Sequence, residues 1–292
     1  MTVIEKWRAA GQEYYDKLRL LTYPLAIKYI KDESEIPTKA MRPSKINQRL
    51  SLCQAFTTAR RLGRSVGMTF EDNHCITSSF VQGWKYMPGK EILKSQILSG
   101  YHSNPSAELR IQLQFSELMT KEALEKVKGN IGFVISPLPK TDVIPDVILT
   151  YGNPAQVTHI IHALSYEGRY LVNNQAFLGY GESCIRGVLV PYISNKSQVV
   201  LPGTGDRTMA MTMENEMAFG MPAKRLFYVL KNLFKSGKEY NMGLPSKFIL
   251  FDMPFPMGPN AFRFLDRQYK RLQKGRLKKK KRKVRSEKNN GL

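Results

Sequence analysis

The chain has 292 residues, 42% of them hydrophobic, which supplies enough apolar material for one large domain or two smaller ones. Its net charge of +21 is uneven: from Phe262 onward, 14 Lys and Arg against two acidic residues give +12, which leaves +9 for the other 261 residues. No apolar run approaches the roughly 18 residues of a transmembrane helix, and no signal peptide pattern follows the charged N-terminus. We therefore expect a cytoplasmic protein with no membrane span. Three cysteines without an export signal argue against a disulfide scaffold.

The first part of the chain alternates helical and extended patterns. Apolar residues at helical intervals predict an amphipathic helix over residues 4–20, and a short apolar run predicts a strand from Leu25 to Ile30. A second helix is predicted over residues 46–62, with Cys53 on its apolar face. A strand from Ser65 to Thr69 follows, and an acidic turn then leads to the second cysteine.

The remaining elements follow from apolar periodicity and from proline and glycine stops. Helices are expected at Ile76 to Val81, Glu91 to Leu98, Ser106 to Lys128, Pro154 to Tyr166 and Pro222 to Phe234. Strands are expected at Ile131 to Ile135, Asp146 to Thr150, Tyr170 to Val172 and Phe248 to Phe251. A turn is expected from Gly179 to Cys184, and a basic helix from Phe262.

Two stretches of the chain have a similar order of features, which suggests an internal repeat. In each, a helix ends at Gly-Arg, a strand and a turn follow, and Cys-Ile comes next; the glycines are Gly63 and Gly168, 105 positions apart. The fold class is therefore predicted as α/β or α+β, with two similar units around a shared cleft and a basic C-terminal extension. The alternative is a chance similarity between two ordinary helix and strand segments.

The predicted organisation has four segments. They are an N-terminal helix (1–20), a first α/β unit (21–128), a second α/β unit with a closing strand (129–260) and a basic tail (261–292).

The three cysteines are candidate metal ligands. Cys53, Cys75 and Cys184 come from three different segments and match the thiolate supply of an iron–sulfur cluster or a zinc site. His74 or Asp72 is a candidate fourth ligand. The alternatives are a redox or nucleophilic thiol, and simple burial in the core.

A glycine-containing turn is a candidate site for a small anionic ligand. Gly203 and Gly205 free backbone N–H groups, and Arg207 supplies a guanidinium. The turn lacks the patterns of a Walker or dinucleotide loop. Arg207 is alternatively paired with Glu214 or Glu216 inside the protein.

The C-terminal tail is a candidate polyanion-binding segment. Its basic block consists of Lys278, Lys279, Lys280, Lys281, Arg282 and Lys283. Such a block binds nucleic acid weakly and without sequence readout, because it acts by releasing counterions from phosphates. The alternative is a tail that only increases solubility or adheres to RNA.

Several short motifs, in order, resemble one family. They are Leu18-Arg-Leu-Leu-Thr-Tyr-Pro-Leu-Ala-Ile-Lys-Tyr29, Cys53-Gln-Ala55, Asp72 with Cys75, Pro145-Asp-Val-Ile-Leu149, Asn153-Pro-Ala-Gln156, Gly205-Asp-Arg207 and Glu216-Met-Ala-Phe-Gly-Met-Pro222. Together they resemble the prokaryotic family catalogued as domain of unknown function 169, over about residues 18–235. The resemblance implies a cytoplasmic protein, often of anaerobes, with cysteines near the three positions above and no established activity. The basic tail lies outside it.

Three functional hypotheses follow. The first is a protein that binds an iron–sulfur cluster or a metal ion through the three cysteines and exchanges electrons with a redox partner. The second is a non-enzymatic module for a small anionic ligand, with the cysteines only buried. The third is nucleic-acid association through the tail. The sequence leaves open whether the protein is an enzyme.

Overall fold

A computed structural model describes residues 1–88, 90–91, 94–95, 104, 106, 125–170, 172–173, 182–236, 244 and 263–275. The chain divides into two compact units, Met1–Ser236 and Gly237–Leu292. Most of the two predicted helices at Glu91 to Leu98 and Ser106 to Lys128, and the whole predicted strand at Phe248 to Phe251, lie outside the described residues. The four predicted segments remain a prediction.

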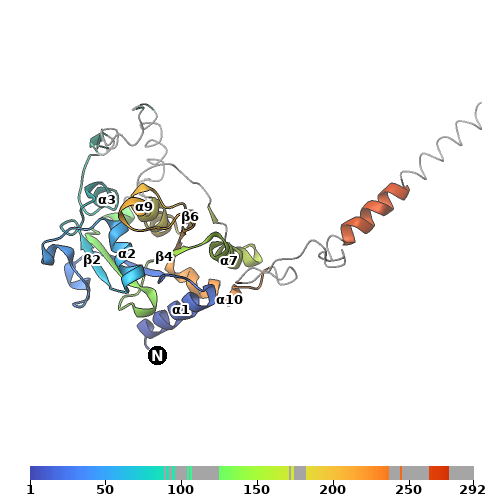
Figure 1. Ribbon diagram of the computed structural model, residues 1–292, viewed down its shortest axis with the longest axis horizontal. Helices are drawn as coiled ribbons and strands as arrows, with labels where there is room; N and C mark the ends of the chain where they lie inside the picture. The colour runs from blue at the N-terminus through green and yellow to red at the C-terminus, as the bar shows by residue number, and fades with distance from the viewer. Residues whose placement is uncertain are drawn as a thin grey trace, which may run out of the picture. The chain divides into compact units, whose positions relative to one another are not determined.

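A seven-stranded sheet forms the centre of the first unit (Figure 1). Its order is β2 (Val66–Thr69), β3 (Gly132–Pro137), β1 (Leu25–Ile30), β4 (Val147–Gly152), β7 (Met217–Pro222), β6 (Ser197–Val200) and β5 (Val172–Asn173). All neighbours are antiparallel except β5, which is parallel to β6. With the helices below, the sheet confirms the α/β class.

Helices flank this sheet. The α-helices are α1 (Val3–Leu18), α2 (Leu52–Leu62), α3 (Ile76–Val81), α7 (Pro154–Ser165), α8 (Val190–Ser194), α9 (Thr204–Met209) and α10 (Leu226–Asn232), and η5 (Glu182–Leu189) is a π-helix. Short 3-10 helices are η1 (Glu33–Glu35), η2 (Pro43–Ile46), η3 (Leu138–Lys140), η4 (Tyr166–Gly168) and η6 (Ala223–Arg225).

Local capping explains where the main helices begin. Thr2 and Glu5 form a capping box at α1, and Asn153 with Gln156 forms another at α7, so each pair satisfies backbone N–H groups that the first turn leaves free. Ser51 caps α2 in the same way. The predicted helix over 46–62 therefore begins too early, because Asn47 adopts a left-handed conformation that ends η2.

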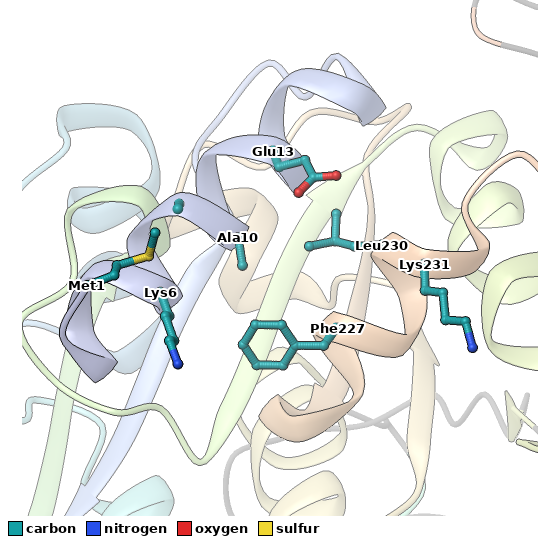
Figure 2. A pocket seen from close by; sticks show the side chains of 8 residues that line it. Met1, Lys6, Ala10, Glu13, Phe227, Leu230 and Lys231 are labelled. Atoms are coloured by element: carbon teal, nitrogen blue, oxygen red, sulfur yellow. The ribbon is translucent and has the colours of Figure 1, made fainter.

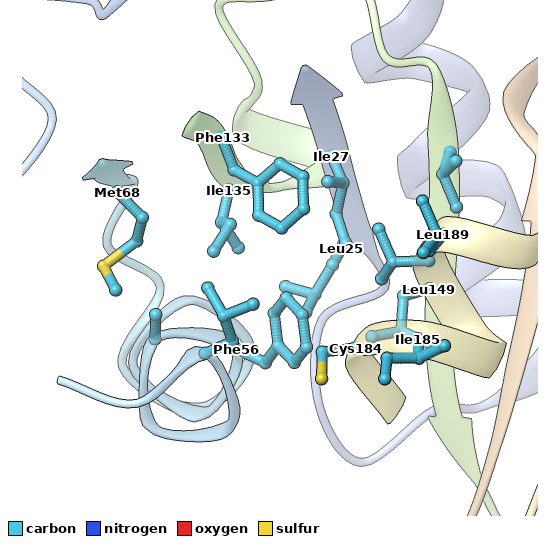
Figure 3. Close-up of a cluster of buried hydrophobic side chains, with 14 of the residues drawn as sticks. Leu25, Ile27, Phe56, Met68, Phe133, Ile135, Leu149, Cys184, Ile185 and Leu189 are labelled. Atoms are coloured by element: carbon cyan, nitrogen blue, oxygen red, sulfur yellow. The ribbon is translucent and has the colours of Figure 1, made fainter. Parts of the chain in front are cut away.

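The two faces of the sheet bury different helices. Alternate residues such as Leu25, Ile27 and Leu149 pack in one cluster with Phe56 of α2 and with η5 (Figure 3). On the other face α1 reaches β4, since the buried Tyr14 hydroxyl lies 3.2 Å from that of Thr150. Because both faces are covered, β3 and β4 are buried along their whole length.

The structure does not show the predicted repeat. Strand β3 of the second predicted unit lies between β2 and β1 of the first, so strands from both predicted units share one sheet rather than packing as two bodies around a cleft. The sequence pattern specified short segments but carried no information on which strands pair, and pairing decides the architecture.

Asp72 organises the loop after β2. Its buried carboxylate accepts hydrogen bonds from the backbone N–H and hydroxyl of Ser44, at 2.9 and 2.6 Å, and from those of Thr69, both at 2.9 Å. It also pairs with Arg42 at 2.9 Å. Burial alone would raise the pKa of Asp72, but the hydrogen bonds from Ser44 and Thr69 hold it below its usual value.

We expect Asp72→Asn to lower the free energy of unfolding at pH 7 by about 2–4 kcal/mol, because it leaves Arg42 and the loop donors without their charged acceptor. Since the folded pKa of Asp72 is depressed, its contribution is present above the unfolded pKa and is lost as pH falls through the folded pKa. Urea titrations from pH 7 downward should show wild type and variant converging. A difference that stays constant with pH would contradict this, and the exposed Asp266→Asn is the control.

Candidate functional site

The three cysteines lie on the α2 and η5 side of the sheet. Cys53 is in the first turn of α2, Cys75 is the N-cap of α3, and Cys184 is in the first turn of η5. Cys184 is buried beside Phe56 (Figure 3), and the other two are partly buried. Of the predicted turn from Gly179 to Cys184, residues 179–181 lie outside the described residues. The last three, which end at Cys184, form the start of a π-helix and not a turn, so the prediction is wrong there.

The thiols are near enough to interact electrostatically. Burial raises the pKa of Cys184 first, and negative charge on Cys53 and Cys75 raises it further. The three thiols lie within electrostatic range of one another, and we call the region that holds them the thiol neighbourhood. Among the described residues, however, no three His, Cys, Asp or Glu side chains are gathered closely enough to hold a metal ion.

Asp206, on α9, is the carboxyl group of this neighbourhood. It is 2% exposed, and it accepts a hydrogen bond from the Tyr151 hydroxyl at 3.0 Å. Burial raises the pKa of Cys53 first, and the negative charge of the nearby Asp206 carboxylate raises it further. Burial also raises the pKa of Asp206, and the hydrogen bond from Tyr151 opposes this shift. The sequence analysis did not name Asp206 as a candidate site residue. Its position between Gly205 and Arg207, inside the glycine-containing turn, was the feature that could have pointed to it.

Glu182 adds a second buried carboxyl group near Cys184. It lies 3.6 Å from Arg186, one turn along η5, and both side chains are 5% exposed. Burial raises the pKa of Glu182 to about 7, although Arg186 opposes the shift. Within the described part of the chain, its Oε1 accepts no hydrogen bond. The neighbourhood therefore concentrates acidic groups.

The glycine turn adjoins the thiols. A Cβ atom on Gly205 would lie 3.6 Å from the Cys53 sulfur. Gly203 is the N-cap of α9, and its carbonyl accepts the Arg207 N–H. Arg207 donates to the carbonyls of Pro202 and Met213, at 3.1 and 2.8 Å, so its contacts are with backbone and not with the predicted glutamates. A ligand role for this turn stays a prediction.

The two residues expected as a fourth metal ligand have different surroundings, and a ligand role for either stays a prediction. The carboxylate of Asp72 is held by Ser44, Thr69 and Arg42, and His74 is exposed. The basic block from Lys278 to Lys283 lies outside the described residues. Across the described residues, no helix is both long and apolar enough to cross a membrane.

Two surface hollows lie away from the cysteines. One, of about 430 Å³, opens between α1 and α10 beside Ala10, Phe227 and Leu230 (Figure 2). The other, of about 470 Å³, is lined by Lys39, Met41, Gly63, Arg64, Ser65 and Lys140. Neither contains a cysteine.

The fold and site define an α/β protein with a buried neighbourhood of thiol and carboxyl groups over a mainly antiparallel sheet. The chain belongs to the family DUF169, described as Uncharacterised ArCR, whose model matches residues 15–232. This confirms the resemblance found in the motifs. A relative is the uncharacterized protein MJ0308 of Methanocaldococcus jannaschii, 23% identical over 217 residues, which are 72% of this chain and 86% of the relative. No solved structure matches.

Proposed function

We propose that this protein binds a thiophilic metal ion or an iron–sulfur cluster through Cys53, Cys75 and Cys184, with Asp206 as a further oxygen ligand. The observation that carries the proposal is the approach of α9 to Cys53: a Cβ atom on Gly205, the residue before the buried Asp206, would lie 3.6 Å from the Cys53 sulfur. The two other thiols lie within electrostatic range of this place. These groups come from α2, α3, η5 and α9, four segments distant in sequence.

The donor set suits such a cofactor. Three thiolates and one carboxylate are ligands that zinc accepts, and three thiolates suit a cluster with one open iron. Burial raises the pKa of Cys53, Cys184 and Asp206, so these groups keep their protons when no metal is bound. Binding would then release protons, since metals bind the deprotonated ligands. The bound form also requires the sulfurs to draw closer than they are here.

An anionic ligand at the same place has less support. Arg207 already donates to two backbone carbonyls, and Asp206, the next residue to Gly205, carries a charge of the wrong sign when ionised. An anion near Gly203 and Gly205 would lie close to the Cys53 sulfur. A bound cation stabilises the deprotonated form of these groups, whereas a bound anion repels that form.

The test is anaerobic purification of the full chain with iron, sulfide and zinc analysis, followed by titration of metal-free protein with Co²⁺. We expect about one metal centre per chain, thiolate-to-cobalt charge-transfer absorption and proton release. Cys53→Ser, Cys75→Ser, Cys184→Ser and Asp206→Asn should each weaken binding at least about tenfold.

The matched control is Asp16→Asn, which removes an exposed carboxylate on α1 and should bind Co²⁺ like wild type. Circular dichroism separates loss of binding from loss of folding. A metal-free protein from the anaerobic preparation that also gives no charge-transfer band with Co²⁺ would sink the proposal. So would a folded triple Cys→Ser variant that binds like wild type.

A further inference from the structure

The second compact unit contains an amphipathic helix over residues 263–275. Four large apolar side chains on it are exposed: Phe264 54%, Leu265 60%, Tyr269 62% and Leu272 66%. Exposed clusters of this kind indicate an interaction surface, because burying them elsewhere is favourable.

The apolar and basic side chains take opposite sides of this helix. At about 100° per residue, the four apolar residues fall within an arc of about 140°. The basic residues, Arg263, Arg267, Lys270, Arg271 and Lys274, fall within an arc of about 100° on the other side. The sequence that follows adds the basic block from Lys278 to Lys283.

Two chemical requirements follow for the partner. It must offer an apolar phase to Leu265 and Leu272, and it must carry dense negative charge beside that phase. Nucleic acid supplies the charge but has no apolar layer for an aliphatic stripe. An anionic lipid bilayer supplies both, because its acyl boundary lies beneath charged headgroups that extended Lys and Arg side chains reach.

We propose that residues 263–275 form a membrane-surface helix that lies in the interface of an anionic bilayer. The apolar face enters the acyl boundary, while the basic face of the same helix pairs with headgroups. The apolar face and the basic face are both needed, since either one alone binds a protein only weakly to a membrane. The helix lies on the surface and does not span the bilayer, and the inference is independent of the metal-site proposal.

The test is co-sedimentation of the full chain with vesicles. Phosphatidylcholine vesicles are compared with vesicles in which phosphatidylglycerol replaces part of the lipid. We expect at least about tenfold stronger binding to the anionic vesicles, weakened by salt. The triple variant Phe264→Gln, Leu265→Gln, Leu272→Gln keeps every charge and should lose at least about tenfold of that binding.

The matched control is Leu21→Gln with Ile144→Gln, which removes two exposed apolar side chains from the first unit and should bind like wild type. Circular dichroism with and without vesicles shows whether the triple variant still forms the helix. Absence of wild-type binding to anionic vesicles would overturn the proposal. So would a triple variant that binds them as tightly as wild type, because the charges alone then suffice. RNA retention that exceeds vesicle binding and survives the triple substitution would assign the segment to nucleic acid instead.

Discussion

Replacing Glu216 by glutamine is expected to lower the free energy of unfolding by about 3–5 kcal/mol, because it leaves the Arg60 guanidinium buried without its counter-charge. The two groups meet in a bidentate pair, with Arg60 Nη1 2.7 Å from Oε1 and Nη2 3.2 Å from Oε2. The Arg60 side chain is 0% exposed. Its guanidinium also stacks over the Tyr151 ring, at 4.2 Å.

The Arg60 and Glu216 pair joins α2 to the segment before β7. Burial acts to raise the pKa of Glu216, but Arg60 and the Met213 N–H lower it, so the carboxylate is ionised at neutral pH. Tyr151 links the pair to the candidate site, since its ring lies under Arg60 and its hydroxyl donates to Asp206. The charge pair therefore helps to hold Tyr151, and through it Asp206, in place beside the thiol neighbourhood.

Urea denaturation of Glu216→Gln at pH 7 measures the effect. The exposed Glu13→Gln, which breaks only an i,i+4 pair with Lys17, should change stability by less than about 0.5 kcal/mol. In a double-mutant cycle, Arg60→Met with Glu216→Leu should recover much of the loss, because no buried charge remains. A single Glu216→Gln variant as stable as wild type would contradict the prediction, since Arg61, 3.3 Å from Glu216, loses its counter-charge as well.

Gly220→Ala is the second substitution with a large expected effect, about 3 kcal/mol or more of lost stability. A Cβ atom at Gly220 in β7 would lie 2.0 Å from the Gly187 carbonyl oxygen and 2.6 Å from its carbon. Both belong to the backbone of η5, so the clash cannot be relieved by turning a side chain. The helix must move away from the sheet, and with it Cys184 and Glu182.

The matched comparison is Gly187→Ala, in which the new Cβ meets the tip of Leu149 at 2.7 Å. That methyl group can rotate, so we expect a loss nearer 1 kcal/mol. Gly275→Ala, with no atom within 4 Å of the new Cβ, should be close to neutral. Thermal unfolding of the three variants gives the order. Equal losses for Gly220→Ala and Gly187→Ala would contradict the close backbone approach.

Local signals predicted much of the first unit. Apolar runs located β1, β3 and β4 to within about two residues, and helical periodicity located α1 and α7. Local residues specify these helices, since capping residues such as Thr2 and Asn153 act within one helical turn. Strands β6 and β7 were missed. β7 contains Gly220 and ends at Pro222, residues that weaken a strand pattern, and its pairing with both β4 and β6 makes it a central strand.

The sequence by itself determined the family, the α/β class, the main helices and three cysteines in separate segments. Only the folded chain shows which strands pair, that Cys184 lies in a π-helix, and that α9 approaches Cys53 at Gly205, 152 positions away in the sequence. The difference lies in the sequence separation over which each interaction acts. Caps and periodicity act between residues a few positions apart, whereas strand order and the approach of α9 to Cys53 depend on how whole elements bury their apolar faces together.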